Sequence, residues 1–249
     1  MYTNEEDLLD LRIRTGWEFF DKFVIVEATK THSGKSKPLF YKQNEGRFSA
    51  FHNKIVHIIV DDMPIGFDNW ARENHQREAI KRALVDCEDN DVIFVSDCDE
   101  IPSPEAIKSN LHLLNNFDVV YMVMDDYEYY FNVYRGKWKK ASFLKWKNAK
   151  RLSFSDLRGI KEGTEFTEVY GGWHFSWLGG TQAIIEKLGN YAHAEYDLPF
   201  FKLPQIWDKR LSKLSEDMFG HKLTKVEIGE SHPKYLVENQ ELFKKYLAL

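Results

Sequence analysis

Continuously apolar segments alternate with amphipathic ones over the first half of the chain. Four apolar segments rich in β-branched residues predict buried strands at 22–28, 54–60, 91–96 and 117–124. Helices are predicted between them: one that follows Asn4 and ends before Gly16, one capped by Asp68, and one from about Ser103 to Leu114. Because these strands are continuously apolar and alternate with helices, we expect a parallel sheet covered on both faces.

The second half of the chain has shorter, more aromatic segments. Strands are expected within 127–134, 141–146 and 169–178, a short helix over 181–188, and a last helix from about Pro233 to the end. No repeat, low-complexity tract or long linker divides the sequence. We therefore expect one α/β domain over residues 1–249, with a mostly parallel, Rossmann-like sheet, helices on both faces and a mixed, aromatic-rich second half.

Composition narrows the class of protein. The 249 residues are 43% hydrophobic and 29% charged, as in ordinary globular proteins, and a net charge of −5 gives no reason to expect nucleic acid or an anionic membrane as partner. No apolar run approaches the roughly 20 residues that span a bilayer, and the polar, acidic start does not resemble a signal peptide. Two cysteines without metal or disulfide spacing suit a reducing compartment. We expect a cytoplasmic protein; the alternative is the luminal domain of a membrane-anchored enzyme.

Asp97 and Asp99 directly follow the third predicted strand, in the sequence VIFVSDCDEIPSP. Ligands of open α/β sheets bind beyond the carboxyl ends of strands, and two adjacent carboxylates need a cation between them. Mg²⁺ or Mn²⁺, which takes oxygen ligands and keeps phosphate oxygens, fits best. The structural alternative is a pair of turn or capping residues. A phosphatase that uses Asp97 as nucleophile is a further alternative, although Glu100-Ile101-Pro102 stands where small residues usually follow.

The helix that precedes this strand brings basic and polar side chains to its start. Arg72, Asn74 and Arg77 can hold a pyrophosphate or a base edge near the metal, since a helix N-terminus and guanidinium groups both favour anions. The alternative is a solvated helix face.

Four segments carry a resemblance to a known family: FVIVEATKTHSGKSKP, NWARENHQREAI, DVIFVSDCDEIPSPEAI and GGWHFSWLGG. In this order they closely resemble glycosyltransferase family 17, which includes bisecting β-1,4-N-acetylglucosaminyltransferases. The resemblance implies a GT-A fold, a UDP-sugar donor, a divalent metal and inversion at the anomeric carbon. It implies that Asp97 and Asp99 hold metal and diphosphate, and that Glu27 and Thr29 lie near the uridine. N-acetylglucosamine is the implied sugar; xylose, glucose and galactose remain alternatives.

Such a transfer requires a general base for the acceptor hydroxyl. Candidates are Glu195, Glu168 and Asp126, the last ending the fourth strand beside Asp125. We favour Glu195, because the base in this fold often comes from a loop or helix downstream of the metal motif.

His174 is expected to complete the metal shell, with His232 as the rival ligand. Trp173 and Trp177 supply stacking faces for a sugar, or else pack in the core. We expect residues 1–125 to bind the nucleotide sugar and residues 126–249 to bind a glycan or glycoconjugate acceptor. A non-catalytic carbohydrate-binding protein built on the tryptophans is the remaining alternative.

Overall fold

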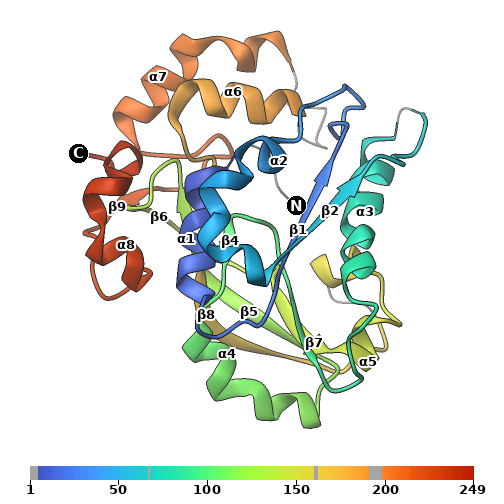
Figure 1. Cartoon of the computed structure of the whole chain (residues 1–249). Coiled ribbons are helices and arrows are strands. Elements are labelled where there is room, and N and C mark those ends of the chain that lie inside the picture. Colours follow the sequence, from blue (N-terminus) through green and yellow to red (C-terminus); the bar gives the residue numbers. More distant parts are fainter. Residues whose placement is uncertain (1–4, 67, 160–161, 191–197) are drawn as a thin grey trace.

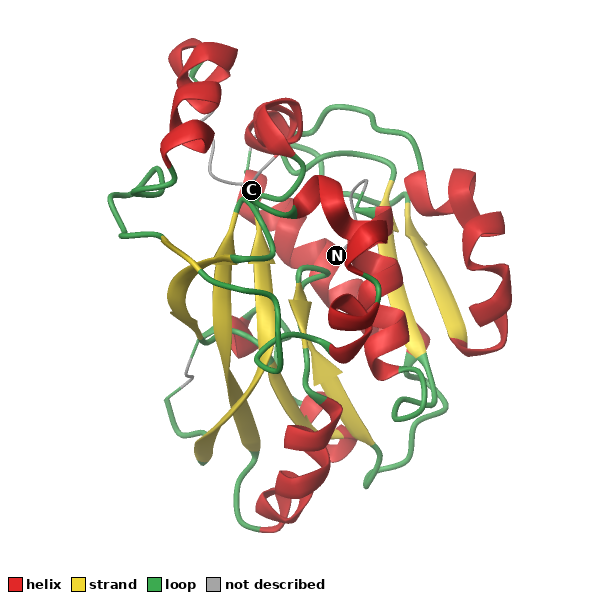
Figure 2. Ribbon diagram, turned by 90° about the vertical axis from the view of Figure 1, so that its left-hand side faces the viewer, coloured by secondary structure: helices red, strands yellow, loops and turns green. Residues whose placement is uncertain are grey.

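The computed structural model describes residues 5–66, 68–159, 162–190 and 198–249, and it shows helices packed around two groups of strands (Figures 1 and 2). Within these ranges no helix is long and apolar enough to cross a bilayer. Short 3₁₀ turns extend several helices, for example Ala79–Ala83 after α3 and Gln240–Tyr246 after α8. The helices are α1 (Glu6–Gly16), α2 (Phe40–Asn44), α3 (Asn69–Glu78), α4 (Pro104–Asn110), α5 (Trp146–Ala149), α6 (Gly180–Asn190), α7 (Pro204–Lys213) and α8 (Lys234–Glu238).

The strands form a small parallel pair and a larger mixed sheet. The parallel pair joins β1 to β2, and the larger sheet runs in the order β3-β7-β5-β6-β9, with β8 against β5 and β4 against β8. The strands are β1 (Phe23–Ala28), β2 (Ile55–Val60), β3 (Val92–Val95), β4 (Glu100–Ile101), β5 (Val119–Glu128), β6 (Val133–Trp138), β7 (Ser142–Lys145), β8 (Phe166–Ser176) and β9 (Thr224–Lys225).

The expected strands and helices of the first half are confirmed, but the expectation of a mostly parallel sheet is corrected. β5 and β8 run parallel, whereas β7 lies between β3 and β5 and pairs antiparallel with both. A cavity of about 590 Å³ lies between β1 and β3. The hydrophobic pattern predicts that a strand is buried on both faces, but it does not say which strand pairs with it or in which direction.

Helix α1 connects the two groups of strands. Leu9 and Ile13 pack with Phe23 and Ile25 of β1, and Leu8 and Leu11 pack with a second cluster that includes Phe131 and Phe175. Helix α1 also carries the half-buried Arg12, whose guanidinium reaches the β3–β4 turn. The same turn buries Cys98 in the cluster on β1.

Two consecutive glycines allow β8 to approach β4 and α4. Gly171 and Gly172 have φ of +152° and +92°, and a Cβ on Gly172 would lie 2.6 Å from the carbonyl oxygen of Ile101. This close approach pairs β4 with β8, so that Glu100 lies opposite His174. The glycines therefore bring His174 beside the acidic turn.

Replacement of Gly172 by Ala should lower the free energy of unfolding by roughly 2–4 kcal/mol, because it adds a backbone clash to a strained φ. Urea denaturation measures this loss. The matched control is Gly46→Ala, where a Cβ meets nothing within 4 Å. Equal stability of both variants would contradict the close approach of β8 to β4.

Candidate active site

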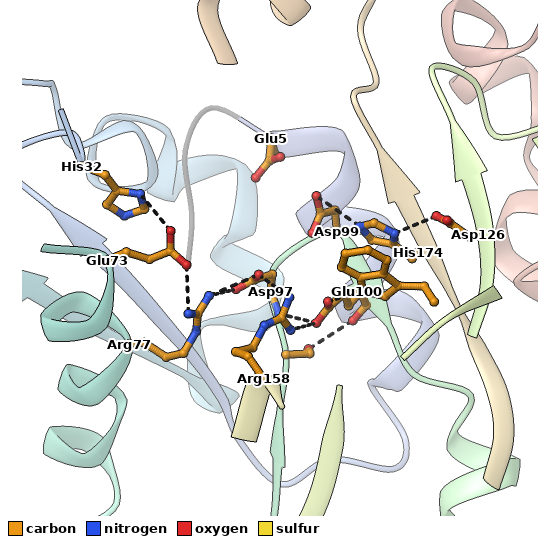
Figure 3. Close-up of polar contacts among 12 residues, drawn as sticks. Glu5, His32, Glu73, Arg77, Asp97, Asp99, Glu100, Asp126, Arg158 and His174 are labelled. Carbon is orange, nitrogen blue, oxygen red and sulfur yellow. Dashed lines mark hydrogen bonds and ion pairs between the residues drawn. The ribbon is translucent and has the colours of Figure 1, made fainter. Parts of the chain in front are cut away.

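Asp97 and Asp99 lie on the turn from β3 to β4, and Glu100 begins β4; their carboxylates point to different partners (Figure 3). Arg12 donates to the carbonyl oxygens of Asp97, at 2.9 Å, and of Glu100, and to the hydroxyl of Ser96 at 2.7 Å. The fully buried carboxylate of Glu100 accepts from the backbone N–H of Asp97 at 2.8 Å. These contacts fix the backbone of the turn.

Two arginines neutralise Asp97. Nη2 of Arg77 lies 3.0 Å from Oδ1 of Asp97, and Nη2 of Arg158 lies 2.9 Å from Oδ2. Arg158 also donates to Glu100 at 2.6 Å, and Arg77 donates to Glu73 at 3.0 Å. Burial by itself would raise the pKa of Asp97, but Arg158 and Arg77 outweigh it and hold the pKa well below its usual range. Asp97 therefore organises two guanidinium groups beside the turn.

Asp99 has different partners. Its Oδ2 lies 3.0 Å from Nζ of Lys187 on α6 and 3.9 Å from Nε2 of His174 on β8. Lys187 also lies 3.6 Å from the carboxylate of Glu5. Burial opposes ionisation of Asp99, but Lys187 and His174 outweigh it and lower the pKa. Burial raises the pKa of Glu5 to about 7, with Lys187 acting in the opposite direction.

His174 is oriented from behind by a carboxylate. Its Nδ1 lies 2.8 Å from Oδ1 of Asp126, and since an ionised carboxylate only accepts, Nδ1 carries the proton. Nε2 is thereby left to face Asp99. The indole of Trp138 stacks on the imidazole at 4.4 Å and donates to Glu100 at 2.6 Å. Burial opposes protonation of His174, but the hydrogen bond to Asp126 and the charge of Asp99 outweigh it and raise the pKa.

Behind Asp126, one arginine is shared by three buried acids. Arg135 donates to Asp126 at 2.7 Å, to Asp217 at 3.1 Å, and lies 3.0 Å from Glu128. Because one guanidinium serves three carboxylates, burial prevails at Glu128 and raises its pKa to about 7. This group keeps Asp126, and through it His174, in place.

A divalent cation fits part of this arrangement. In the described ranges, no three His, Cys, Asp or Glu side chains converge as a metal site. Asp99 and Nε2 of His174 are a suitable pair, and the carboxylate behind His174 is the usual support of a metal-binding histidine. Both oxygens of Asp97 already contact guanidinium groups. Mg²⁺ and Mn²⁺ commonly take one or two protein ligands and complete their shell with waters and substrate phosphates.

The residues expected near the uridine have contacts within the protein. Buried Glu27 accepts from the backbone N–H of Tyr41 at 3.1 Å and lies 3.2 Å from His57. The hydroxyl of Thr29 donates to the carbonyl of Val60 at 3.4 Å.

Of the expected residues on α3, Arg77 alone has a described contact with an acid of the turn. Arg72 donates to the carbonyl of His32 at 2.6 Å and to Asn69 at 3.0 Å, and thus ties the loop after β1 to α3. Asn74 is exposed.

The three candidate bases lie in different settings. Asp126 is buried, and its two oxygens contact His174 and Arg135. Glu168 pairs with Lys139 at 2.6 Å and lies six residues before His174 on β8, about 20 Å along the strand. Glu195 lies outside the described residues. Asp125 pairs with Lys137 at 2.6 Å.

The remaining candidates, two tryptophans and one histidine, differ in their burial and in their contacts. Trp177 is buried in a core cluster with Lys187 above its ring, and Trp173 is half-buried and donates to the carbonyl of Ser231 at 2.6 Å. His232 packs against Tyr127 at 5.0 Å between ring centroids. Of the two rival histidines, His174 is the one that the described contacts place beside Asp99.

Sequence reasoning missed four charged residues of the site: Glu5, Arg12, Arg158 and Lys187. Arg12 and Lys187 lie in helices that the pattern predicts, but only tertiary packing turns them toward the acidic turn. Arg158 follows the turn by about sixty positions in a segment without periodicity. The one signal in the sequence was Glu100, because a third acid so close to Asp97 and Asp99 calls for further cations nearby.

Comparison with known proteins identifies the class. A model of glycosyltransferase family 17 matches residues 1–202, which include the whole Asp97–Glu100 turn, and the chain belongs to this family. The match covers most of the length of the chain.

The curated relatives carry a more specific name. Proteins of Homo sapiens and Rattus norvegicus named beta-1,4-mannosyl-glycoprotein 4-beta-N-acetylglucosaminyltransferase are each 28% identical to this chain over 112 residues. The matched stretch covers 42% of this chain and 21% of either relative. The mouse protein of the same name is 27% identical over the same length.

Replacement of Glu128 by Gln should change how stability depends on pH. The pKa of Glu128 is about 7 in the folded protein and near 4.5 when unfolded, so its contribution is complete below about pH 4.5 and is lost as pH rises through 7. Between these values the wild type should lose roughly 2–3 kcal/mol relative to the variant. Denaturation in urea across this range measures the difference; a constant difference would contradict the buried acid.

Proposed function

We propose that the protein transfers N-acetylglucosamine from a UDP donor to a hydroxyl of a glycan, with inversion. The family supports sugar transfer, and the names of the relatives support this sugar and a glycan acceptor. The observation that carries the proposal is the convergence of Asp99 and His174, 3.9 Å apart, with two guanidinium groups and one ammonium around the same turn. Carboxylate, imidazole and several cations together suit a metal–diphosphate ligand.

The two halves of the chain take different parts in this proposal. Residues 1–125 bind the nucleotide in a GT-A-type arrangement, with Arg77 and, from the second half, Arg158 directing positive charge at the diphosphate. Hydrogen bonds to the backbone from Glu27, Thr29 and Arg72 hold the segments on the nucleotide side in place. Residues 126–249 supply the acceptor side, where half-buried Trp173 offers a better stacking face than buried Trp177.

Asp99 and His174 would hold the divalent metal, and Asp126 fixes the tautomer that leaves Nε2 unprotonated toward it. The metal, when bound, neutralises negative charge that develops on the leaving diphosphate. Asp97 contributes indirectly, because it holds Arg77 and Arg158 in position.

The displacement joins the acceptor oxygen to the anomeric carbon as the bond to the diphosphate breaks. A base must take the hydroxyl proton. We propose Glu195, because the oxygens of Asp126 contact other residues and Glu168 is paired to Lys139 far along β8. The contacts of Asp97 disfavour its use as a phosphatase nucleophile, since both its oxygens face arginines.

Replacement of Asp99 by Asn should reduce kcat/KM for UDP-sugar turnover by about a thousandfold or more and remove Mn²⁺-dependent UDP binding, because a metal ligand is lost. Turnover of a panel of UDP-sugars, followed by UDP release, measures this effect. Asp125→Asn, which removes a surface ion pair, is the matched control. Unchanged UDP binding and turnover in Asp99→Asn would refute the proposed site.

Replacement of Glu195 by Gln should leave UDP binding within about twofold of wild type and reduce transfer by at least a hundredfold, as expected for loss of a general base. Calorimetry with UDP and Mn²⁺ and a product assay measure the two effects separately. If transfer persists at the wild-type rate, another group takes the proton.

A further inference from the structure

Lys187 occupies the position next to Asp99 where a bound cation would be expected. It extends from α6, places Nζ 3.0 Å from Oδ2 of Asp99 and 3.6 Å from Glu5, and lies over the ring of Trp177 at 5.5 Å. Its side chain is 30% exposed, whereas that of Asp99 is 12% exposed. The ammonium is thus held at the rim of the site, in contact with the carboxylate that faces the interior.

The two aspartates of the turn differ in how firmly their cations are held. The side chain of Arg77 is 5% exposed, and its guanidinium is shared between Asp97 and Glu73, while Arg158 is shared between Asp97 and Glu100. These planar groups are fixed by several hydrogen bonds each. A lysine carries a compact charge on a flexible four-carbon stem, so Lys187 can leave Asp99 by rotation of its side chain.

An ammonium and a divalent ion compete for the same carboxylate. A metal bound between Asp99 and His174 would lie close to Nζ of Lys187, and like charges at this range repel strongly in a partly buried site. Glu5, 3.6 Å from Nζ, is a second carboxylate beside the displaced ammonium. A diphosphate brings additional negative charges that suit both the metal and Lys187.

We propose that Lys187 is the resident cation of Asp99, that the donor diphosphate releases it, and that the metal and the UDP moiety therefore bind together. This inference rests on the proposed function. Asp99 exchanges the ammonium for the metal, while Lys187 turns to the phosphate oxygens. The protein thus resists binding the metal alone, and a metal and a nucleotide that each bind weakly alone reinforce one another by the same factor.

Titration of Mn²⁺ by electron paramagnetic resonance, with and without UDP, tests the inference without any turnover. In the wild type, UDP should tighten Mn²⁺ binding at least tenfold. In Lys187→Met, Mn²⁺ alone should bind at least tenfold more tightly than to the wild type, and UDP should add less than threefold. Lys209→Met, an exposed lysine on α7, is the matched control and should behave as wild type.

A second variant separates charge from packing. Lys187→Arg retains a cation beside Asp99 and should retain most of the coupling between UDP and Mn²⁺, with melting temperatures recorded for every variant. If Lys187→Met does not fold, Lys187→Gln takes its place and should show the same gain in Mn²⁺ affinity.

The outcomes separate this inference from the proposed function. The wild type can bind Mn²⁺ in the presence of UDP while neither neutral variant gains affinity for Mn²⁺ alone. This result overturns the role of Lys187 and leaves the proposed function standing. Wild type and variants that bind no Mn²⁺ even with UDP overturn both. Tight binding of Mn²⁺ alone to the wild type also overturns the inference.

Discussion

The balance of charge at the β3–β4 turn is the constraint on which the rest of the site depends. Three acids fall within four positions, and buried like charges of this kind are strongly unfavourable unless cations reach them. The chain supplies these cations from separate elements: Arg12 from α1, Arg77 from α3, Arg158 from the segment before β8, and Lys187 from α6. Formation of the turn therefore requires that most of the chain be folded around it.

This dependence explains why elements far apart in sequence meet there. The pairing of β4 with β8 sets Glu100 opposite His174, and the parallel pairing of β5 with β8 sets Asp126 opposite the same histidine. Gly172 permits the approach of β8, and Arg135 anchors Asp126 from the other side. The resulting histidine has one nitrogen fixed by a carboxylate and the other directed at Asp99 (Figure 3).

The features that the sequence predicted correctly are those that depend on residues close in sequence. The strand that ends at Val95, the Asp68 cap of α3 and the position of Asp97 and Asp99 beyond a strand all follow from residues close in sequence. The sheet order did not follow, because no local feature of β7 shows that it inserts antiparallel between β3 and β5. Arg158 and Lys187 were missed for the same reason: their function depends on tertiary contacts across 58 and 88 positions.

The central claim is that Asp99 and His174 hold a cation that binds with the diphosphate of the donor, while Asp97 keeps its two arginines. A crystal structure with UDP and Mn²⁺ tests this claim most directly. The account predicts the ion between Asp99 and Nε2 of His174, phosphate oxygens in its remaining positions, and Arg77 and Arg158 still on Asp97. An ion bound by Asp97 in place of its arginines, or a diphosphate bound away from this turn, would contradict the account.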